Sequence, residues 1–210
     1  THALWNRYLA RKVIEKKPAA IIDLCAGTGE IAFRLMKEAN RCSLAYPSIE
    51  LVDFSEQMLK VAEQSAHTLP QELQQKLTFI QGNVEQLLQP NESFQAATCA
   101  YGIRNVNNPE KCLSQVLRVL QPGGSFYILE LTRPKNVILK TMHGLYLRTM
   151  LPLIGKWLTS NKDAYSYLQK SIETFVCPEV LAQMAQKVGF TKTEIKPLNG
   201  SIATLITLTK

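Results

Sequence analysis

Short apolar runs alternate with longer stretches of helical periodicity along most of the 210 residues. Such short runs are typical of strands buried on both faces, and apolar residues three or four positions apart are typical of helices that pack on a sheet. The pattern predicts an α/β fold, a doubly wound sheet of seven mostly parallel strands. The Asn199-Gly200 pair predicts a hairpin, which makes the last strand antiparallel. The predicted strands are 19–24, 49–53, 77–81, 94–101, 125–131, 191–197 and 203–210.

Capping residues mark several helix boundaries. Ser55 is typical of a helix N-terminus, as is Asn108 followed by Pro109, and Gly189 is typical of a helix end. Spacing also predicts which side chains pack on the sheet. These include Leu4, Tyr8, Leu9, Val13 and Ile14 from a first helix over 4–17, Ile31, Leu35 and Met36 from the helix after the first strand, and Met58, Leu59 and Ala62 from the helix after Ser55.

The first strand is followed by a glycine-rich turn and the start of a helix. In α/β sheets this arrangement presents a helix N-terminus and backbone N–H groups to a ligand. Gly27, Gly29 and Ala32 satisfy the loose dinucleotide fingerprint. Asp23 and Glu30 argue against a pyrophosphate, because they place negative charge beside it. S-adenosylmethionine, which carries an ammonium and a sulfonium, fits an acid-flanked loop better. A dinucleotide, or a turn with no ligand, stays open.

Polar residues also stand at the ends of later strands. Asp53 ends the second strand about 20 residues beyond the loop, where an acid accepts the ribose hydroxyls of a nucleoside; helix capping is the alternative. Asn83 follows the third strand and is placed to bond an adenine edge, or is simply a turn residue. Arg104 and Asn105 follow the fourth strand, which lies beside the first strand in a doubly wound sheet. The end of the fourth strand is therefore where ligand and substrate would meet. The alternative for these two residues is a helix cap and a surface charge. Glu130 lies near the C-terminal end of the fifth strand.

The stretch 136–158 is apolar at helical spacing and is interrupted by Pro152 and Gly155. We expect a single domain over 1–210 with an apolar helical lid inserted at about 136–175. A membrane-facing surface, a core helix and a dimer interface are the alternatives for this stretch.

Composition and charge indicate the compartment and the kinds of partner to expect. The five cysteines are odd in number and contain no Cys-x-x-Cys pair, which favours a reducing cytoplasm over a disulfide framework or a zinc site. We therefore expect a cytoplasmic protein without a metal. If it contacts a membrane, we expect that contact to be peripheral. The net charge is +7 and the pI about 9.2. This balance suits an anionic surface, but the Lys and Arg residues are scattered, so nucleic acid is not indicated.

Two motifs resemble those of class I S-adenosylmethionine-dependent methyltransferases. They are Asp-Leu-Cys-Ala-Gly-Thr-Gly at 23–29 and Leu-Gln-Pro-Gly-Gly at 120–124. Closer matches at 101–106 (Tyr-Gly-Ile-Arg-Asn-Val) and 165–172 (Tyr-Ser-Tyr-Leu-Gln-Lys-Ser-Ile) resemble the menaquinone/ubiquinone-biosynthesis C-methyltransferases, over essentially the whole chain. This resemblance implies a Rossmann-like fold, S-adenosylmethionine as cofactor, and methylation of the ring of a demethylated prenyl quinol such as demethylmenaquinol.

The resemblance also implies roles for individual residues. The family's cofactor contacts fall on Gly27, Thr28, Gly29, Asp53, Asn83, Val84 and Ala100, and its active-site pair on Arg104 and Asn105. We add Asp23 to the cofactor contacts and Glu130 as a candidate proton acceptor. The chain has Ala26, Ala100 and Lys170 where the family usually has Gly, Ser and Glu. The family's N-terminal Tyr-Asp…Asn segment is absent, so we expect the chain to be trimmed at that end.

Other functions stay open at this point. One is a different small-molecule O- or N-methyltransferase, and another is a non-catalytic methyltransferase-like binding subunit. The partners that we expect are a prenylated quinol and, transiently, a membrane surface, with no nucleic acid; a homodimer is left open.

Overall fold

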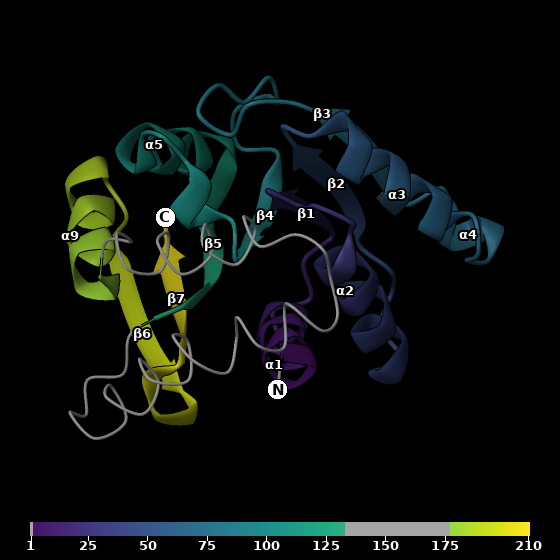
Figure 1. Cartoon of the computed structure of the whole chain (residues 1–210), viewed down its shortest axis with the longest axis horizontal. Helices are drawn as coiled ribbons and strands as arrows, with labels where there is room; N and C mark the ends of the chain where they lie inside the picture. The colour runs from purple at the N-terminus through teal and green to yellow at the C-terminus, as the bar shows by residue number, and fades with distance from the viewer. Residues whose placement is uncertain (1, 133–176) are drawn as a thin grey trace, which may run out of the picture.

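The computed structural model describes residues 2–132 and 177–210, so the segment expected to form a lid, 136–175, lies outside the described residues. Seven strands of the described part form one sheet in the order β3-β2-β1-β4-β5-β7-β6 (Figure 1). The strands are β1 (Ala20–Leu24), β2 (Ser48–Asp53), β3 (Leu77–Gln81), β4 (Phe94–Ala100), β5 (Leu120–Leu131), β6 (Lys192–Leu198) and β7 (Ala203–Thr209). Neighbouring strands from β3 to β5 pair in parallel, whereas β7 is antiparallel to both β5 and β6. The predicted sheet is confirmed.

Helices connect the strands and cover both faces of the sheet. They are α1 (His2–Ile14), α2 (Glu30–Arg41), α3 (Glu56–Ala66), α4 (Gln71–Gln74), α5 (Pro109–Val119) and α9 (Pro178–Val188), with short 3-10 turns η1 (Ile103–Asn105) and η3 (Asn199–Ser201). The predicted caps of α3 and α5 are confirmed. The Ser55 hydroxyl accepts the Met58 N–H, and the Asn108 side chain accepts the Lys111 N–H.

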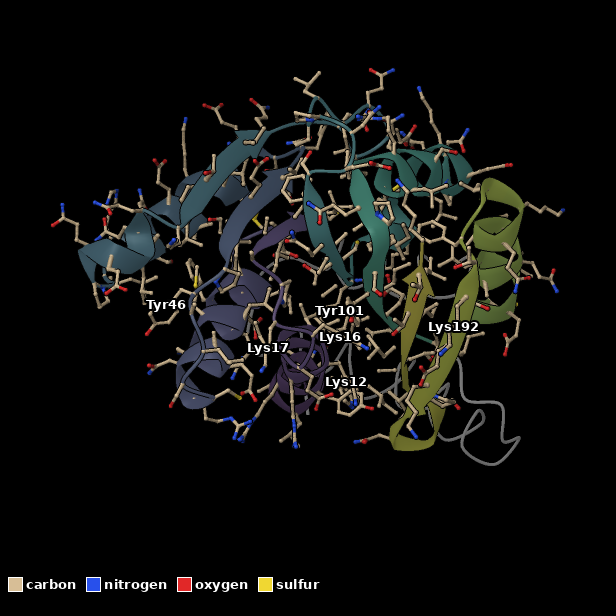
Figure 2. All side chains as sticks on the ribbon, turned by 180° about the vertical axis from the view of Figure 1, so that it is seen from behind. Lys12, Lys16, Lys17, Tyr46, Tyr101 and Lys192 are labelled. Carbon is tan, nitrogen blue, oxygen red and sulfur yellow. The ribbon has the colours of Figure 1, made fainter. Side chains whose placement is uncertain are left out.

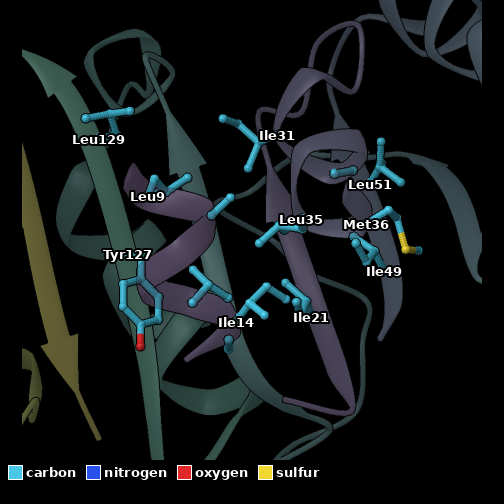
Figure 3. Close-up of a cluster of buried hydrophobic side chains, with 14 of the residues drawn as sticks. Leu9, Ile14, Ile21, Ile31, Leu35, Met36, Ile49, Leu51, Tyr127 and Leu129 are labelled. Atoms are coloured by element: carbon cyan, nitrogen blue, oxygen red, sulfur yellow. The ribbon is translucent and has the colours of Figure 1, made fainter. Parts of the chain in front are cut away.

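Successive strand residues point to opposite faces, so the sheet separates two apolar cores. On one face Ile21, Leu51 and Tyr127 pack against α1, α2 and α3 (Figure 3). On the other face Ile22 and Phe126 pack against α5 and α9. Every one of these side chains is buried, and this two-sided burial explains why the strands are continuous apolar runs.

Three local expectations were wrong. Leu4 is 67% exposed, because the buried stripe of α1 consists of Trp5, Leu9 and Val13 with their neighbours. Met58 is 43% exposed and lines a cavity instead of the core. The fifth strand begins at Leu120, not at Ser125, since the Pro-Gly-Gly sequence forms an irregularity within β5 rather than a turn outside it.

Candidate active site

The glycine-rich turn joins β1 to α2 at the carboxyl edge of the sheet. Gly29 caps α2 with φ 79°, a left-handed conformation that favours glycine. A Cβ at Gly29 would also lie 2.9 Å from the ring of Phe33. Gly27 has a positive φ as well, at 54°. The sequence therefore needs glycine at both positions to turn the chain from β1 into α2.

Asp53, at the end of β2, holds this turn in place. Its Oδ2 accepts the Gly27 N–H at 2.8 Å, and its Oδ1 accepts the Ser55 N–H at 2.8 Å. The carboxylate therefore orders the turn and the start of α3 while it faces the cavity beside them. Each carboxylate oxygen has a second lone pair left for a ligand hydroxyl.

A cavity of about 580 Å³ opens at this edge, where β1, β2, β3 and β4 end. Its wall contains eight of the residues predicted as site residues, namely Asp23, Gly27, Thr28, Asp53, Asn83, Val84, Ala100 and Asn105. Gly29, Arg104 and Glu130 are not part of the wall. The parallel register brings four strand ends that are far apart in sequence to one edge, and Asn6 of α1 adds a fifth segment to the wall.

The charge of the wall is one-sided. Its carboxylates come from Asp23, Glu30, Asp53 and Glu85, and no Lys or Arg belongs to it in the described part of the chain. Opposite charges at close range attract strongly in a partly buried site. This cavity therefore suits a cationic ligand and disfavours a pyrophosphate.

Asp23 is the buried carboxylate at the base of the glycine-rich turn. It is 1% exposed, its Oδ1 accepts the Thr98 hydroxyl at 2.6 Å, and its Oδ2 is buried without a hydrogen-bond partner in the described structure. Burial, supplemented by the nearby charge of Asp53, raises the pKa of Asp23 to about 7. A cation near Oδ2 would supply the missing interaction.

Asn83 fills the role of a turn residue in the structure. Its side-chain oxygen accepts the Glu85 N–H at 2.9 Å, and the residue also lines the cavity. Val84 beside it is 8% exposed and adds an apolar contact surface. The two roles weighed for Asn83 are thus compatible, because the turn uses only the side-chain oxygen and leaves the side-chain N–H₂ group for a ligand.

Arg104 and Glu130 meet next to this cavity. The Arg104 guanidinium forms a hydrogen-bonded ion pair with Glu130 Oε1, and their side chains are 10% and 0% exposed. Burial raises the pKa of Glu130, although Arg104 and the Leu131 N–H oppose the shift. Arg104 Nε and Glu130 Oε2 have no partner in the described structure. The pair therefore keeps a buried donor and a buried acceptor that the described structure does not use.

Sequence reasoning missed a hydrogen-bonded chain of three residues in the wall of the cavity. The Tyr101 hydroxyl donates to Asn6 Oδ1 at 2.8 Å, and Asn6 Nδ2 donates to Glu30 Oε1 at 2.8 Å. All three residues line the cavity, and Asn6 is only 1% exposed. No sequence pattern pairs Asn6 with Tyr101 across 95 positions. A polar residue within the apolar stripe of α1 was the available indication.

The motif after β4 is packed tightly against the glycine-rich turn. A Cβ at Gly102 would lie 2.3 Å from Cys25 Cβ and 3.2 Å from Cys99 Sγ. The neighbouring Cys25 thiol, together with burial, raises the pKa of Cys99. Glycine at position 102 thus allows the turn to approach the chain that carries Arg104.

Within residues 2–132 and 177–210 no three His, Cys, Asp or Glu residues are grouped to hold a metal ion. No helix in them combines the length and apolar character that crossing a membrane requires.

Sequence comparisons identify close relatives of this chain. The model of the ubiE/COQ5 methyltransferase family matches residues 1–210. A demethylmenaquinone methyltransferase of Protochlamydia amoebophila is 44% identical over 98% of this chain and 84% of its own length. A ubiquinone/menaquinone biosynthesis C-methyltransferase UbiE of Rickettsia massiliae is 36% identical over 97% of this chain and 81% of its own length.

Structural comparisons confirm the predicted fold class. A SAM-dependent methyltransferase from Aquifex aeolicus matches with a TM-score of 0.64 at 11% identity, over 91% of this chain and 81% of that one. Human N-acetylserotonin methyltransferase in complex with SAM matches with a TM-score of 0.65 at 15% identity, over 98% of this chain and 51% of that one. The family model that matches residues 1–210 and the relative that is 44% identical show that the chain belongs to the ubiE/COQ5 methyltransferase family.

Proposed function

We propose that this protein is an S-adenosylmethionine-dependent C-methyltransferase that methylates the ring of a demethylated prenyl quinol in quinone biosynthesis. The family match and the names of the relatives support this activity. The structural observation that carries it is the acid-lined cavity at the carboxyl edge of the sheet, with the buried pair of Arg104 and Glu130 beside it. The quinol that best fits the relatives' names is demethylmenaquinol.

The residues present fit S-adenosylmethionine. The turn at Gly27, Thr28 and Gly29 places the N-terminus of α2 at the cavity, where the positive end of the helix dipole suits a carboxylate. Asp53 has lone pairs for ribose hydroxyls, and the wall segment of Asn83 and Val84 suits an adenine. Ala100, which has no polar side-chain atom, would contribute backbone or van der Waals contact. The remaining carboxylates, including the orphaned oxygen of Asp23, favour the ligand's positive charges.

When bound, S-adenosylmethionine supplies a methyl group on a positively charged sulfur, which is already electrophilic. The chain's task is then to hold the ring carbon in line with that methyl group and to make the carbon nucleophilic. A quinol ring carbon becomes a better nucleophile when the neighbouring hydroxyl loses its proton. The site must therefore accept a proton and stabilise the oxygen anion that remains.

Arg104 and Glu130 divide these two tasks. Arg104 Nε, buried and without a partner in the described structure, donates to the developing oxygen anion. A guanidinium is a poor base, because its pKa exceeds about 12. Glu130 Oε2 accepts the proton, for which its raised pKa suits it. Asn105, in the cavity wall, orients the ring hydroxyl or a water between them.

The rest of the substrate requires an apolar site. The stretch 136–175 would house the prenyl tail as a lid within a single domain over 1–210. Its apolar sequence supports this role, and the net charge of +7 supports brief contact with an anionic membrane where the quinol resides.

Calorimetric titration followed by a turnover assay tests the proposal. We expect the full-length protein to bind S-adenosylmethionine and not NADH, and then to convert demethylmenaquinol to menaquinol. Catechols and simple amines serve as control substrates for O- and N-methyl transfer. Preferential turnover of a control substrate, or binding of NADH alone, would overturn the proposal.

A further inference from the structure

A second cavity lies at the opposite edge of the sheet, where β4 and β5 begin and β7 ends. Its volume is about 490 Å³. Lys16 and Lys17, which follow α1, form part of its wall, and Lys192 at the start of β6 forms another part. The cofactor cavity uses the carboxyl edge, so the two cavities share no residue.

Strand register explains why this cavity is polar. Ser125 on β5 lies opposite Thr209 on β7, which lies opposite Lys192 on β6. Two residues further along, Tyr127, Thr207 and Glu194 form the next row. Because side chains repeat every second residue, both rows face the same side of the sheet. This side of the three strands therefore carries hydroxyl groups and a lysine at the cavity.

The hydroxyl groups are close enough to act on one ligand. The Ser125 and Thr209 hydroxyl oxygens lie 3.4 Å apart, and the Thr207 hydroxyl belongs to the same wall. Hydroxyl groups donate one hydrogen bond each and rotate to meet an acceptor. They complement lysines, which bind phosphate groups as point charges.

The charge of this wall is opposite to that of the cofactor cavity. It contains three lysines and one carboxylate, from Glu194. None of the three lysines forms an ion pair within residues 2–132 and 177–210, whereas nearby Lys12 pairs with Glu15 at 3.0 Å. Lys12, Lys16, Lys17 and Lys192 are labelled in Figure 2. The proposed cofactor site therefore does not account for the three lysines of this second cavity.

We propose that this cavity binds a small soluble molecule that carries a phosphate or diphosphate group. The three lysines supply the charge, and the hydroxyls of Ser125 and Thr209 supply directional hydrogen bonds. Its volume exceeds the needs of a single phosphate and leaves room for a diphosphate or a small organic group. The inference stands apart from the proposed methyl transfer, because it uses none of the same residues.

A phospholipid headgroup offers the same chemistry, but the geometry favours a soluble ligand. A membrane at the amino edge of the sheet would lie against Lys16 and Lys192, on the side away from the cavity that contains Asp53. A prenyl quinol would then have to reach the far edge of the protein. If the cavity binds a soluble ligand, the quinol can approach the other edge of the sheet directly.

Calorimetry with inorganic pyrophosphate, on the full-length protein, tests the proposal. We expect saturable one-to-one binding that weakens at least tenfold in Lys16→Gln/Lys192→Gln. Thr209→Val removes a hydroxyl without changing charge and should weaken binding at least threefold. Lys37→Gln/Lys60→Gln, on exposed positions of α2 and α3, makes the same charge change elsewhere and should leave the affinity within twofold. Affinity for S-adenosylmethionine should stay unchanged in all three variants.

Three outcomes would overturn the proposal. The first is no saturable binding of pyrophosphate at millimolar concentration. The second is an equal loss of affinity in the control variant, which would indicate only general attraction to a basic protein. The third is binding to phosphatidylglycerol vesicles that depends on Lys16 and Lys192 while pyrophosphate fails to bind, which would identify a membrane contact instead.

Discussion

Arg104 and Glu130 form a buried ion pair that joins the turn after β4 to the end of β5, its parallel neighbour. Glu130 is fully buried, and only one of its oxygens is hydrogen-bonded in the described structure. A buried pair of this kind is costly to break, because removing one partner leaves an uncompensated charge. Its position beside the acid-lined cavity makes it the centre of the chemistry that we propose.

Replacing Arg104 should separate binding from turnover. In Arg104→Gln we expect kcat to fall about 10²–10³-fold, through lost stabilisation of the oxygen anion, while the Kd for S-adenosylmethionine changes less than threefold. Turnover assays and calorimetry measure the two quantities. Arg104 is not in the cavity wall, which is why the cofactor should be insensitive to its loss.

A double variant controls for stability. Arg104→Gln alone should lower the free energy of unfolding by about 3–5 kcal/mol, because Glu130 is left buried without its partner. In Arg104→Gln/Glu130→Gln most of that loss should be recovered, whereas activity should not. Recovery of activity together with stability would assign the pair a structural role only.

Asp53 should behave in the opposite way. Asp53→Ala removes the acceptor for the Gly27 and Ser55 N–H groups and for the ribose, so we expect the affinity for S-adenosylmethionine to fall at least about 100-fold, or about 2.7 kcal/mol. Calorimetry measures this loss. Glu56→Ala is the matched control, since that carboxylate forms only an exposed pair with Lys60. A loss below threefold in Asp53→Ala would contradict the assignment.

Cofactor binding should depend on pH through Asp23. The pKa of this carboxyl is about 7, and a cationic ligand favours its ionised form. We therefore expect the affinity for S-adenosylmethionine to rise by up to about tenfold per pH unit below 7 and to level off above it. Asp23→Asn keeps the shape and the Thr98 contact, so its profile should be flatter. An unchanged slope in that variant would exclude Asp23 as the titrating group.

Asp23 should also make the free energy of unfolding depend on pH. Its folded-state pKa lies above the ordinary value of 3.8, so the buried neutral form is favoured. Its stabilising contribution is therefore fully present below about pH 4 and is lost as the pH rises through about 7. Urea titrations of the ligand-free protein should show a shallower decline over this range in Asp23→Asn than in the native protein. An equal decline would assign the trend to other groups.

A side chain at position 102 should destabilise the protein, and a second substitution at Cys25 should restore part of the lost stability. Gly102→Ala places a Cβ 2.3 Å from Cys25 Cβ, so we expect a loss of about 1–3 kcal/mol in the free energy of unfolding. Adding Cys25→Gly removes the clashing atom and suits the φ of 51° at that position, and should restore part of the loss. Adding Cys25→Ala keeps the Cβ and should not. Equal effects of the two second changes would contradict this contact as the cause.

The sequence predicted the elements whose causes are local. Burial on both faces makes β1 and β4 continuous apolar runs, and capping requires particular residues, such as Ser55, at a helix start. The parallel pairing follows from the same pattern, because βαβ connections place the carboxyl ends of the strands at one edge. Asp53 could therefore be assigned to the site from its position alone, and the structure brings it to the glycine-rich turn.

Features that depend on contacts between distant segments were not predictable in this way. The hydrogen bonds that join Asn6 to Tyr101 and to Glu30 link three elements, and their geometry depends on how α1 packs on the sheet. The Arg104 and Glu130 side chains were each identified, but their ion pair follows from neighbouring strands rather than from sequence spacing. Leu4 was misplaced because Trp5, four residues before Leu9, occupies the buried position at the start of the stripe.

The most direct test of the account is to locate the transferred methyl group. Full-length protein would be incubated with S-adenosylmethionine carrying a ¹³C-methyl group and with demethylmenaquinol, and the product examined by NMR. The account predicts a ¹³C signal of a methyl group bonded to the quinol ring carbon, which disappears in Asp53→Ala and is strongly reduced in Arg104→Gln. A label found on oxygen, or the absence of any labelled product, would contradict the proposed C-methyl transfer.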